Sequence, residues 1–153
     1  MKIYLAGPWF NDEQMERIQK IEKTLELFSE QGVEVFSPRK ETLVLPNASH
    51  EDRRKAFEGN IHGIDKCDVI LVCADDNDKG TMFEAGYAYA TNTPILYYSD
   101  TLGTKPFNLM LACSTFLGCA KSTDELKTKI GEILAYGLLE MRTHGYRYEG
   151  EIE

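Results

Sequence analysis

An acidic loop leading into a helix that carries a glutamate is the segment of the chain best suited to chemistry. Residues 74–80 read Ala-Asp-Asp-Asn-Asp-Lys-Gly, and Thr81 is a predicted N-cap that places Glu84 in the first turn of the next helix. The partial positive charge of a helix N-terminus favours an ionised carboxylate, the form that acts as a nucleophile. Glutamate is also common there for helix stability alone, so a catalytic and a structural interpretation both stay open.

This loop contains three aspartates, Asp75, Asp76 and Asp78. They are compatible either with a solvated loop or with a metal site. They lack the spacing and the distal glutamate of a calcium-binding EF-hand loop. The three histidines of the chain lie far apart and do not have the HExxH spacing of a zinc site. We therefore expect no metal ion.

Motifs of several other enzyme classes are missing. The sequence has no GxGxxG after its first predicted strand, no GxxxxGK[ST] phosphate loop and no GxSxG nucleophile turn. Its four cysteines have no CxxC spacing and lie mainly in apolar contexts, which predicts reduced, buried thiols. Carboxylate chemistry without a cofactor is the best remaining candidate.

Aromatic side chains gather where the first predicted strand ends. Tyr4, Trp9 and Phe10 could pack in the core, or they could form a flat surface on which a nucleobase stacks. The spacing alone does not separate these two roles.

Length and composition indicate one compact globular unit. The 153 residues suit a single domain over 1–153, with 42% hydrophobic and 27% charged residues. No apolar run approaches the length of a membrane-spanning helix and no cleavable leader is recognisable, so we expect a cytoplasmic protein without membrane contacts. The formal net charge of -8 opposes binding to a polynucleotide but not to a single nucleoside.

The elements that must position these residues alternate between strands and helices. The predicted strands are short and apolar and cover residues 2–6, 33–36, 68–73, 94–98 and 116–120. The predicted helices cover residues 11–31, 50–64, 81–91, 107–112 and 122–141. This alternation predicts an α/β fold, a doubly wound sheet of about five mainly parallel strands flanked by helices. Ligands then belong at the carboxyl ends of the strands, in loops 7–10, 37–49, 74–81 and 99–108.

Three motifs, in this order, resemble those of the nucleoside 2-deoxyribosyltransferases. They are Tyr4-Leu-Ala-Gly-Pro-Trp-Phe10, Gly80-Thr-Met-Phe-Glu-Ala-Gly-Tyr-Ala88 and Lys105-Pro-Phe-Asn-Leu-Met110. The likeness extends to the C-terminal Tyr148-Glu-Gly-Glu-Ile-Glu153 and so covers essentially the whole chain. It implies a flavodoxin-like fold that acts on deoxynucleosides and free nucleobases, without a cofactor.

The resemblance also implies a covalent mechanism. Glu84 would attack the anomeric carbon of 2-deoxyribose and displace the base, and a second base would then collect the sugar. Two displacements retain configuration, as in retaining glycosidases. Tyr4 would hydrogen-bond to the nucleophile and orient it.

Other residues are assigned to the substrate by the same resemblance. Asp78 and Asn108 would hold the 5'-hydroxyl of the sugar, with Gly80 and Met110 beside them. In the family this asparagine reaches into the site of a neighbouring subunit. Asn108 therefore implies a homo-oligomer built on dimers, with a hexamer as one alternative.

One position departs from the family pattern. Many members have an aspartate in the helix before the central strand, placed to protonate the departing base, and this chain has Asn60 there. An amide can hydrogen-bond to a base but cannot deliver a proton. The acid step and the base preference are therefore open. The resemblance places loop 37–49 at the base, and the tail with Tyr148 and Glu153 over it.

Three alternatives to a transferase fit parts of the pattern. A hydrolase of 2'-deoxynucleoside 5'-monophosphates would use water to resolve the intermediate, but Asp78 would repel its phosphate. A non-catalytic nucleoside-binding domain would need no nucleophile. A flavodoxin-type electron carrier would need a Ser/Thr-rich phosphate nest after the first strand, which the sequence lacks.

Overall fold

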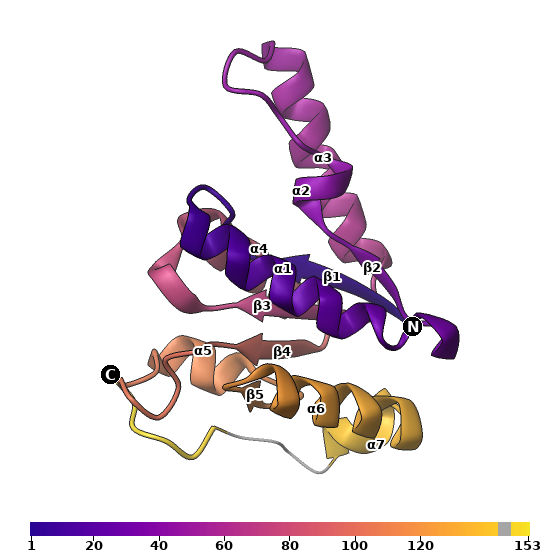
Figure 1. Ribbon diagram of the computed structural model, residues 1–153, viewed down its shortest axis with the longest axis vertical. Helices are drawn as coiled ribbons and strands as arrows, with labels where there is room; N and C mark the ends of the chain where they lie inside the picture. The colour runs from indigo at the N-terminus through magenta and orange to yellow at the C-terminus, as the bar shows by residue number, and fades with distance from the viewer. Residues whose placement is uncertain (144–147) are drawn as a thin grey trace.

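The computed structural model describes residues 1–143 and 148–153, and in this part of the chain five strands form one parallel sheet (Figure 1). The strands are β1 (Lys2–Ala6), β2 (Glu34–Phe36), β3 (Val69–Cys73), β4 (Ile95–Tyr98) and β5 (Cys119–Ala120). Their order is β2-β1-β3-β4-β5, and every neighbouring pair is parallel. This is the flavodoxin-like order, so the predicted fold class is confirmed.

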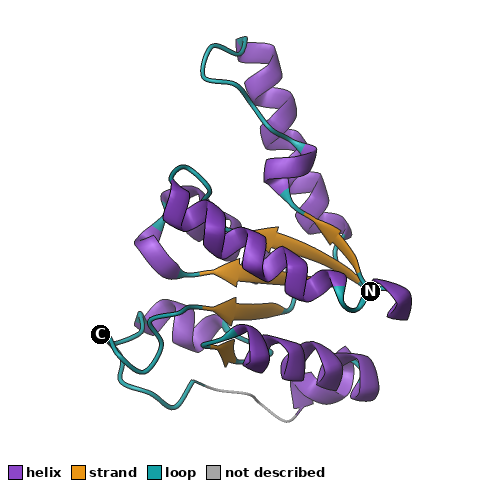
Figure 2. Ribbon diagram, viewed as in Figure 1, coloured by secondary structure: helices purple, strands orange, loops and turns teal. Residues whose placement is uncertain are grey.

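The helices of the chain include two short 3-10 segments. They are α1 (Asp12–Glu26), η1 (Ser29–Gln31), α2 (Pro38–Glu41), α3 (His50–Lys66), η2 (Asp75–Asn77), α4 (Lys79–Ala90), α5 (Leu109–Ser114), α6 (Thr123–Tyr136) and α7 (Leu138–Thr143). Figure 2 shows them around the strands, whose arrows point toward the same edge of the sheet. In the described residues, no helix is long and apolar enough to cross a membrane.

Each face of the sheet has its own apolar cluster. On one face, α1 and α6 bury Ile18, Leu25 and Ile130 against Ile3 and Leu5. On the other face, α3, α4 and α5 bury Ile64, Ala85, Ala88 and Ala112 against Tyr4 and Ile70. Side chains alternate along a strand, so Tyr4 must face α4 when Ile3 and Leu5 face α1. The small alanines of α4 let that helix lie close to the sheet.

The helix before β3 is buried only at its end. Gly63 and Ile64 are the residues of α3 that are buried, and Figure 1 shows the rest of the helix and the preceding loop extending beyond the sheet. Gly63 has a packing role, because a Cβ there would lie 3.0 Å from Phe36 and 3.1 Å from Tyr4. A larger residue would push α3 away from β1.

Several predicted boundaries were wrong. The predicted helix 11–31 ends at Glu26, and the predicted closing helix 122–141 is divided at Gly137, whose φ of 81° a helix cannot accommodate. The predicted strand 116–120 shrinks to its last two residues because Gly118 has a φ of 82°. Loop 37–49 contains the short helix α2.

Candidate active site

A tyrosine and a glutamate from two different elements meet at the side of the sheet covered by α4. Tyr4 Oη donates to Glu84 Oε1 at 2.6 Å, and the two residues lie 80 positions apart. Tyr4 comes from β1, and Glu84 from the helix that follows β3. From β1 the chain first adds β2 on one side and then β3 on the other, so the strand order changes direction between β1 and β3. Proteins of this fold bind ligands at this point of the sheet. The predicted pairing of these side chains is therefore present.

Packing fixes the ring of Tyr4. The side chain is fully buried, and its ring stacks on Phe36 with centroids 5.3 Å apart and planes at 12°. The hydroxyl can therefore reach only a narrow region, which Glu84 occupies. This rigidity suits a residue that orients another side chain.

The charge state of Glu84 differs from the sequence-based expectation. The helix begins at Lys79, so Glu84 lies in its second turn and not in the first, where the N-terminal charge is strongest. Burial raises the pKa of Glu84 to about 7, the hydrogen bond from Tyr4 lowers it, and the charge of Asp78 raises it. Burial and the charge of Glu84 in turn raise the pKa of Tyr4, so the phenol stays protonated.

Asp78 is the residue that begins α4, a role predicted for Thr81. Asp78 Oδ2 accepts from Thr81 N at 2.8 Å and from Thr81 Oγ1 at 2.9 Å. Within the described part of the chain, its other oxygen, Oδ1, accepts no hydrogen bond. Gly80 follows in the first turn and is exposed. Asp78 thus combines a capping oxygen with one that is available to a ligand.

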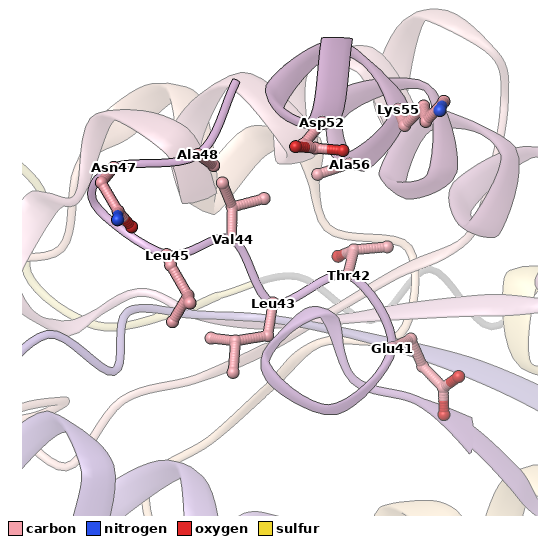
Figure 3. Close-up of a pocket in the computed structure, with 10 residues that line it drawn as sticks. All are labelled: Glu41, Thr42, Leu43, Val44, Leu45, Asn47, Ala48, Asp52, Lys55 and Ala56. Carbon is pink, nitrogen blue, oxygen red and sulfur yellow. The ribbon is translucent and has the colours of Figure 1, made fainter. Parts of the chain in front are cut away.

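Asn60 lies on α3 and contacts a residue that the sequence analysis did not single out. Thr42 Oγ1 lies 2.5 Å from Asn60 Oδ1. Thr42 belongs to the loop predicted to line the base pocket, and it also lines a cavity of about 440 Å³ in that loop. Figure 3 shows the loop residues from Leu43 to Ala48 on one side of this cavity and Asp52, Lys55 and Ala56 of α3 on the other.

This cavity does not include the Tyr4–Glu84 pair. Its lining residues all come from the loop and from the N-terminal half of α3. Thr42 lines the cavity and also donates a hydrogen bond to Asn60, so the cavity borders Asn60. A hydrogen bond between side chains 18 positions apart has no signal in the sequence.

Asn108 and Met110 lie at the start of α5 and are exposed. Asn108 Oδ1 caps the helix, accepting from Met110 N at 3.0 Å and from Leu111 N at 3.4 Å. Met110 is 74% exposed. Both line a groove of about 440 Å³ between α4 and α5, whose other walls include Met82 and Tyr89. Where the structure describes the chain, the hydrogen bonds of the Asn108 side chain do not involve Tyr4 or Glu84.

The two aromatic residues after β1 stack on each other. The rings of Trp9 and Phe10 have centroids 5.4 Å apart. Phe10 is 73% exposed and Trp9 is half-buried. The interpretation that these aromatic residues pack in the core is therefore wrong for Phe10. The expectation of buried thiols is likewise wrong for Cys113, which is exposed.

A partly buried ion-pair network around Arg17 was missed by the sequence analysis. Asp75 is 5% exposed and accepts from Ser99 Oγ at 2.8 Å, which rules out a solvated loop at this position. Arg17 pairs with Asp75, Asp76 and Asp100. Within residues 1–143 and 148–153, no group of three or more metal-ligating side chains could hold an ion.

The fold and this pair define an α/β protein with a carboxylate site at the border between β1 and β3. The sequence matches the family model of nucleoside 2-deoxyribosyltransferase over residues 3–130. The chain therefore belongs to the nucleoside 2-deoxyribosyltransferase family.

Similar proteins agree with this membership. A 2-deoxyribosyltransferase from Bacillus psychrosaccharolyticus is 29% identical, with a TM-score of 0.70 over 83% of this chain and 90% of that one. Two further structures share the fold: a 2-desoxiribosyltransferase from Leishmania mexicana (22% identity, 88% and 97% coverage, TM-score 0.63) and a CMP N-glycosidase from Clostridium botulinum (18%, 86% and 98%, 0.57).

A curated relative matches part of the chain. An uncharacterized protein of Ureaplasma parvum is 30% identical over 95 residues, which are 59% of this chain and 60% of that protein. The match thus spans less than two thirds of the relative.

Proposed function

We propose that this protein transfers 2-deoxyribose between nucleobases through a covalent intermediate on Glu84. The observation that carries the proposal is the 2.6 Å hydrogen bond from Tyr4 to Glu84 in a chain of this family. A carboxylate held by one rigid donor keeps its second oxygen for attack. The substrates are 2'-deoxynucleosides and free bases, and no cofactor takes part.

The reaction consists of two displacements. Glu84 attacks the anomeric carbon as the bond to the base nitrogen breaks, so the carboxylate becomes an ester and the base leaves with the bonding electron pair and takes up a proton. The nitrogen of a second base then attacks the same carbon, loses its proton and restores the carboxylate. Two inversions at one carbon give retention.

Recognition of the sugar uses two polar side chains. Asp78 Oδ1 is available to accept from the 5'-hydroxyl, and we assign Asn108 to the same hydroxyl in the site of a neighbouring subunit. The exposure of Asn108 and Met110 and the groove beside them support an assembly in which α4 and α5 meet a second copy. We assign Gly80, Trp9 and Phe10 to the walls of this shared site.

Chromatography of reactions with thymidine, with and without adenine, tests the proposal. Deoxyadenosine formed with a matching loss of thymidine supports transfer. Free thymine and deoxyribose whether or not adenine is present would instead indicate a hydrolase. Binding without turnover of thymidine or of the other deoxynucleosides would indicate a nucleoside-binding domain. A nucleoside monophosphate is the less suitable substrate, because Asp78 would repel its phosphate.

The rate of transfer should rise through neutral pH. Because the nucleophile must be ionised and the pKa of Glu84 is about 7, kcat/KM should increase about tenfold from pH 6 to pH 8. The Tyr4→Phe variant removes a hydrogen bond that lowers this pKa, so its profile should move to higher pH and its rate at pH 7 should fall. Measuring kcat/KM against pH for the wild type and for Tyr4→Phe tests both expectations. A kcat/KM of the wild type that does not change with pH would contradict the first.

The base preference should depend on Asn60. Asn60→Asp supplies a carboxyl group that can donate a proton to the departing base, so the ratio of rates for different bases should change by about tenfold or more. Thr42→Val is the matched control, since it removes the contact to the Asn60 amide without adding an acid. Transfer rates measured with several donor bases test this prediction. Identical relative rates for Asn60→Asp and wild type would show that Asn60 takes no part in the reaction.

A further inference from the structure

A buried arginine joins the two loops that precede Asp78 and Asn108. The side chain of Arg17, on α1, is 9% exposed. Its Nη1 donates to Asp76 Oδ2 at 2.8 Å, and its Nε donates to Asp100 Oδ2 at 3.1 Å. Asp76 belongs to the segment between β3 and α4, and Asp100 to the segment between β4 and α5. One guanidinium group therefore holds both segments from the other side of the sheet.

Asp75 ties the same two segments together directly. Its carboxylate accepts from Ser99 Oγ at 2.8 Å, from Thr101 Oγ1 at 3.1 Å and from the backbone N–H of Asp100 at 3.1 Å. Burial opposes the charge of Arg17, but hydrogen bonds to Asp100 and Asp76 and the charge of Asp75 raise its pKa. Arg17 therefore stays cationic wherever the protein is folded.

The backbone next to Asp78 needs such support. Asp76 has a φ of 71° and Asn77 a φ of 48°, two successive residues in a left-handed region that non-glycine residues adopt rarely, although Asp and Asn adopt it more readily than the others. An unfavourable conformation of this kind persists only where surrounding contacts hold it. The ion pair between Arg17 and Asp76 is such a contact, and Asp78 follows two residues later.

We propose that Arg17 is a positioning residue for sugar binding. It holds the segment after β3 so that Asp78 begins α4 at the correct place, and it holds the segment after β4 that leads to Asn108. Arg17 itself does not touch the substrate. The inference rests on the proposed function, in which Asp78 and Asn108 bind the 5'-hydroxyl.

The test compares Arg17→Met with Glu13→Gln in steady-state transfer and in amide hydrogen exchange without substrate. Arg17→Met should raise KM for thymidine about tenfold or more, with a smaller change in kcat, and should speed exchange in residues 75–82 and 100–108. A role in stability alone would lower the melting temperature and leave KM of the folded enzyme unchanged. Glu13→Gln is the matched control, since Glu13 contacts Arg17 from the same helix at 3.0 Å and holds neither loop; it should behave like wild type.

A second variant keeps the inference testable if Arg17→Met does not fold. Asp76→Asn keeps a side chain that tolerates the left-handed region and removes the charge that pairs with Arg17. It should raise KM and speed exchange in residues 75–82, by less than Arg17→Met. Unchanged KM and unchanged exchange in Asp76→Asn would overturn the inference. Absence of transfer by the wild type would overturn the proposed function instead, while exchange would still show whether Arg17 holds the loops.

Discussion

Base exchange should fall by at least about 10³-fold when Glu84 is replaced by alanine, because the variant lacks the carboxylate that we propose forms the covalent intermediate. The hydrogen bond from Tyr4 would lose its acceptor, but the loss of a half-buried side chain leaves no large cavity in the core. The variant should therefore fold and bind nucleosides. Transfer from thymidine to adenine, followed by chromatography, measures the loss.

Two further variants separate chemistry from folding. Glu84→Gln keeps the shape of the side chain and still accepts the hydrogen bond from Tyr4, but it lacks the nucleophilic carboxylate. It should therefore fold like wild type and be as inactive as Glu84→Ala. Glu16→Ala removes an exposed carboxylate that pairs with Lys20 on α1, and it should retain full activity. Near-normal transfer by either Glu84 variant would refute the assignment of the nucleophile.

Stability should move in the opposite direction to activity. The folded pKa of Glu84, about 7, lies above the usual value for glutamate, so the native state binds this proton more tightly than the unfolded chain. Ionisation of Glu84 therefore destabilises the fold as pH rises from about 4.5 to 7. Glu84→Gln removes this cost, so at pH 8 its free energy of unfolding, measured with denaturant, should exceed that of wild type by up to about 3 kcal/mol.

The parts of the fold that could be predicted depend on local patterns. The continuous apolar run of β3 predicts a strand buried on both faces, and all five of its residues are buried. The strand Lys2–Ala6 was predicted with its observed bounds. Boundaries set by a single backbone angle, such as those at Gly118 and Gly137, could not be predicted because glycine adopts both signs of φ.

Residues of the site divide in the same way. The pairing of Tyr4 with Glu84 could be predicted because both belong to motifs that resemble those of the family. Arg17 could not, because its pairing with Asp76 joins positions 59 apart and depends on how α1 packs against the ends of β3 and β4. In the sequence, Asp75 cannot be distinguished from an aspartate in an exposed loop. Only the tertiary structure shows that it is buried and accepts hydrogen bonds from the neighbouring loop.

Mixing two inactive variants should restore activity if Asn108 completes the site of a neighbouring subunit. Asn108→Ser keeps a residue that can cap α5 but is too short to reach a partner's sugar. If the subunits share their sites in this way, each site takes Glu84 from one subunit and Asn108 from the other. After random mixing with Glu84→Ala, each requirement is met half of the time, so about a quarter of all sites should be intact, and about half of the sites in a purified mixed dimer.

Co-expression of the two variants with different affinity tags, followed by tandem purification, gives the mixed oligomers. Their transfer rate should far exceed the sum of the two separate variants. The matched control pairs Glu84→Ala with a chain that carries both substitutions, because that mixture contains no subunit with an intact Glu84 and should stay inactive. Mixed oligomers without recovered activity would mean that Asn108 serves the site of its own chain. In that case the groove between α4 and α5 would not be a shared active-site wall, and the exposure of Met110 would need another partner to explain it.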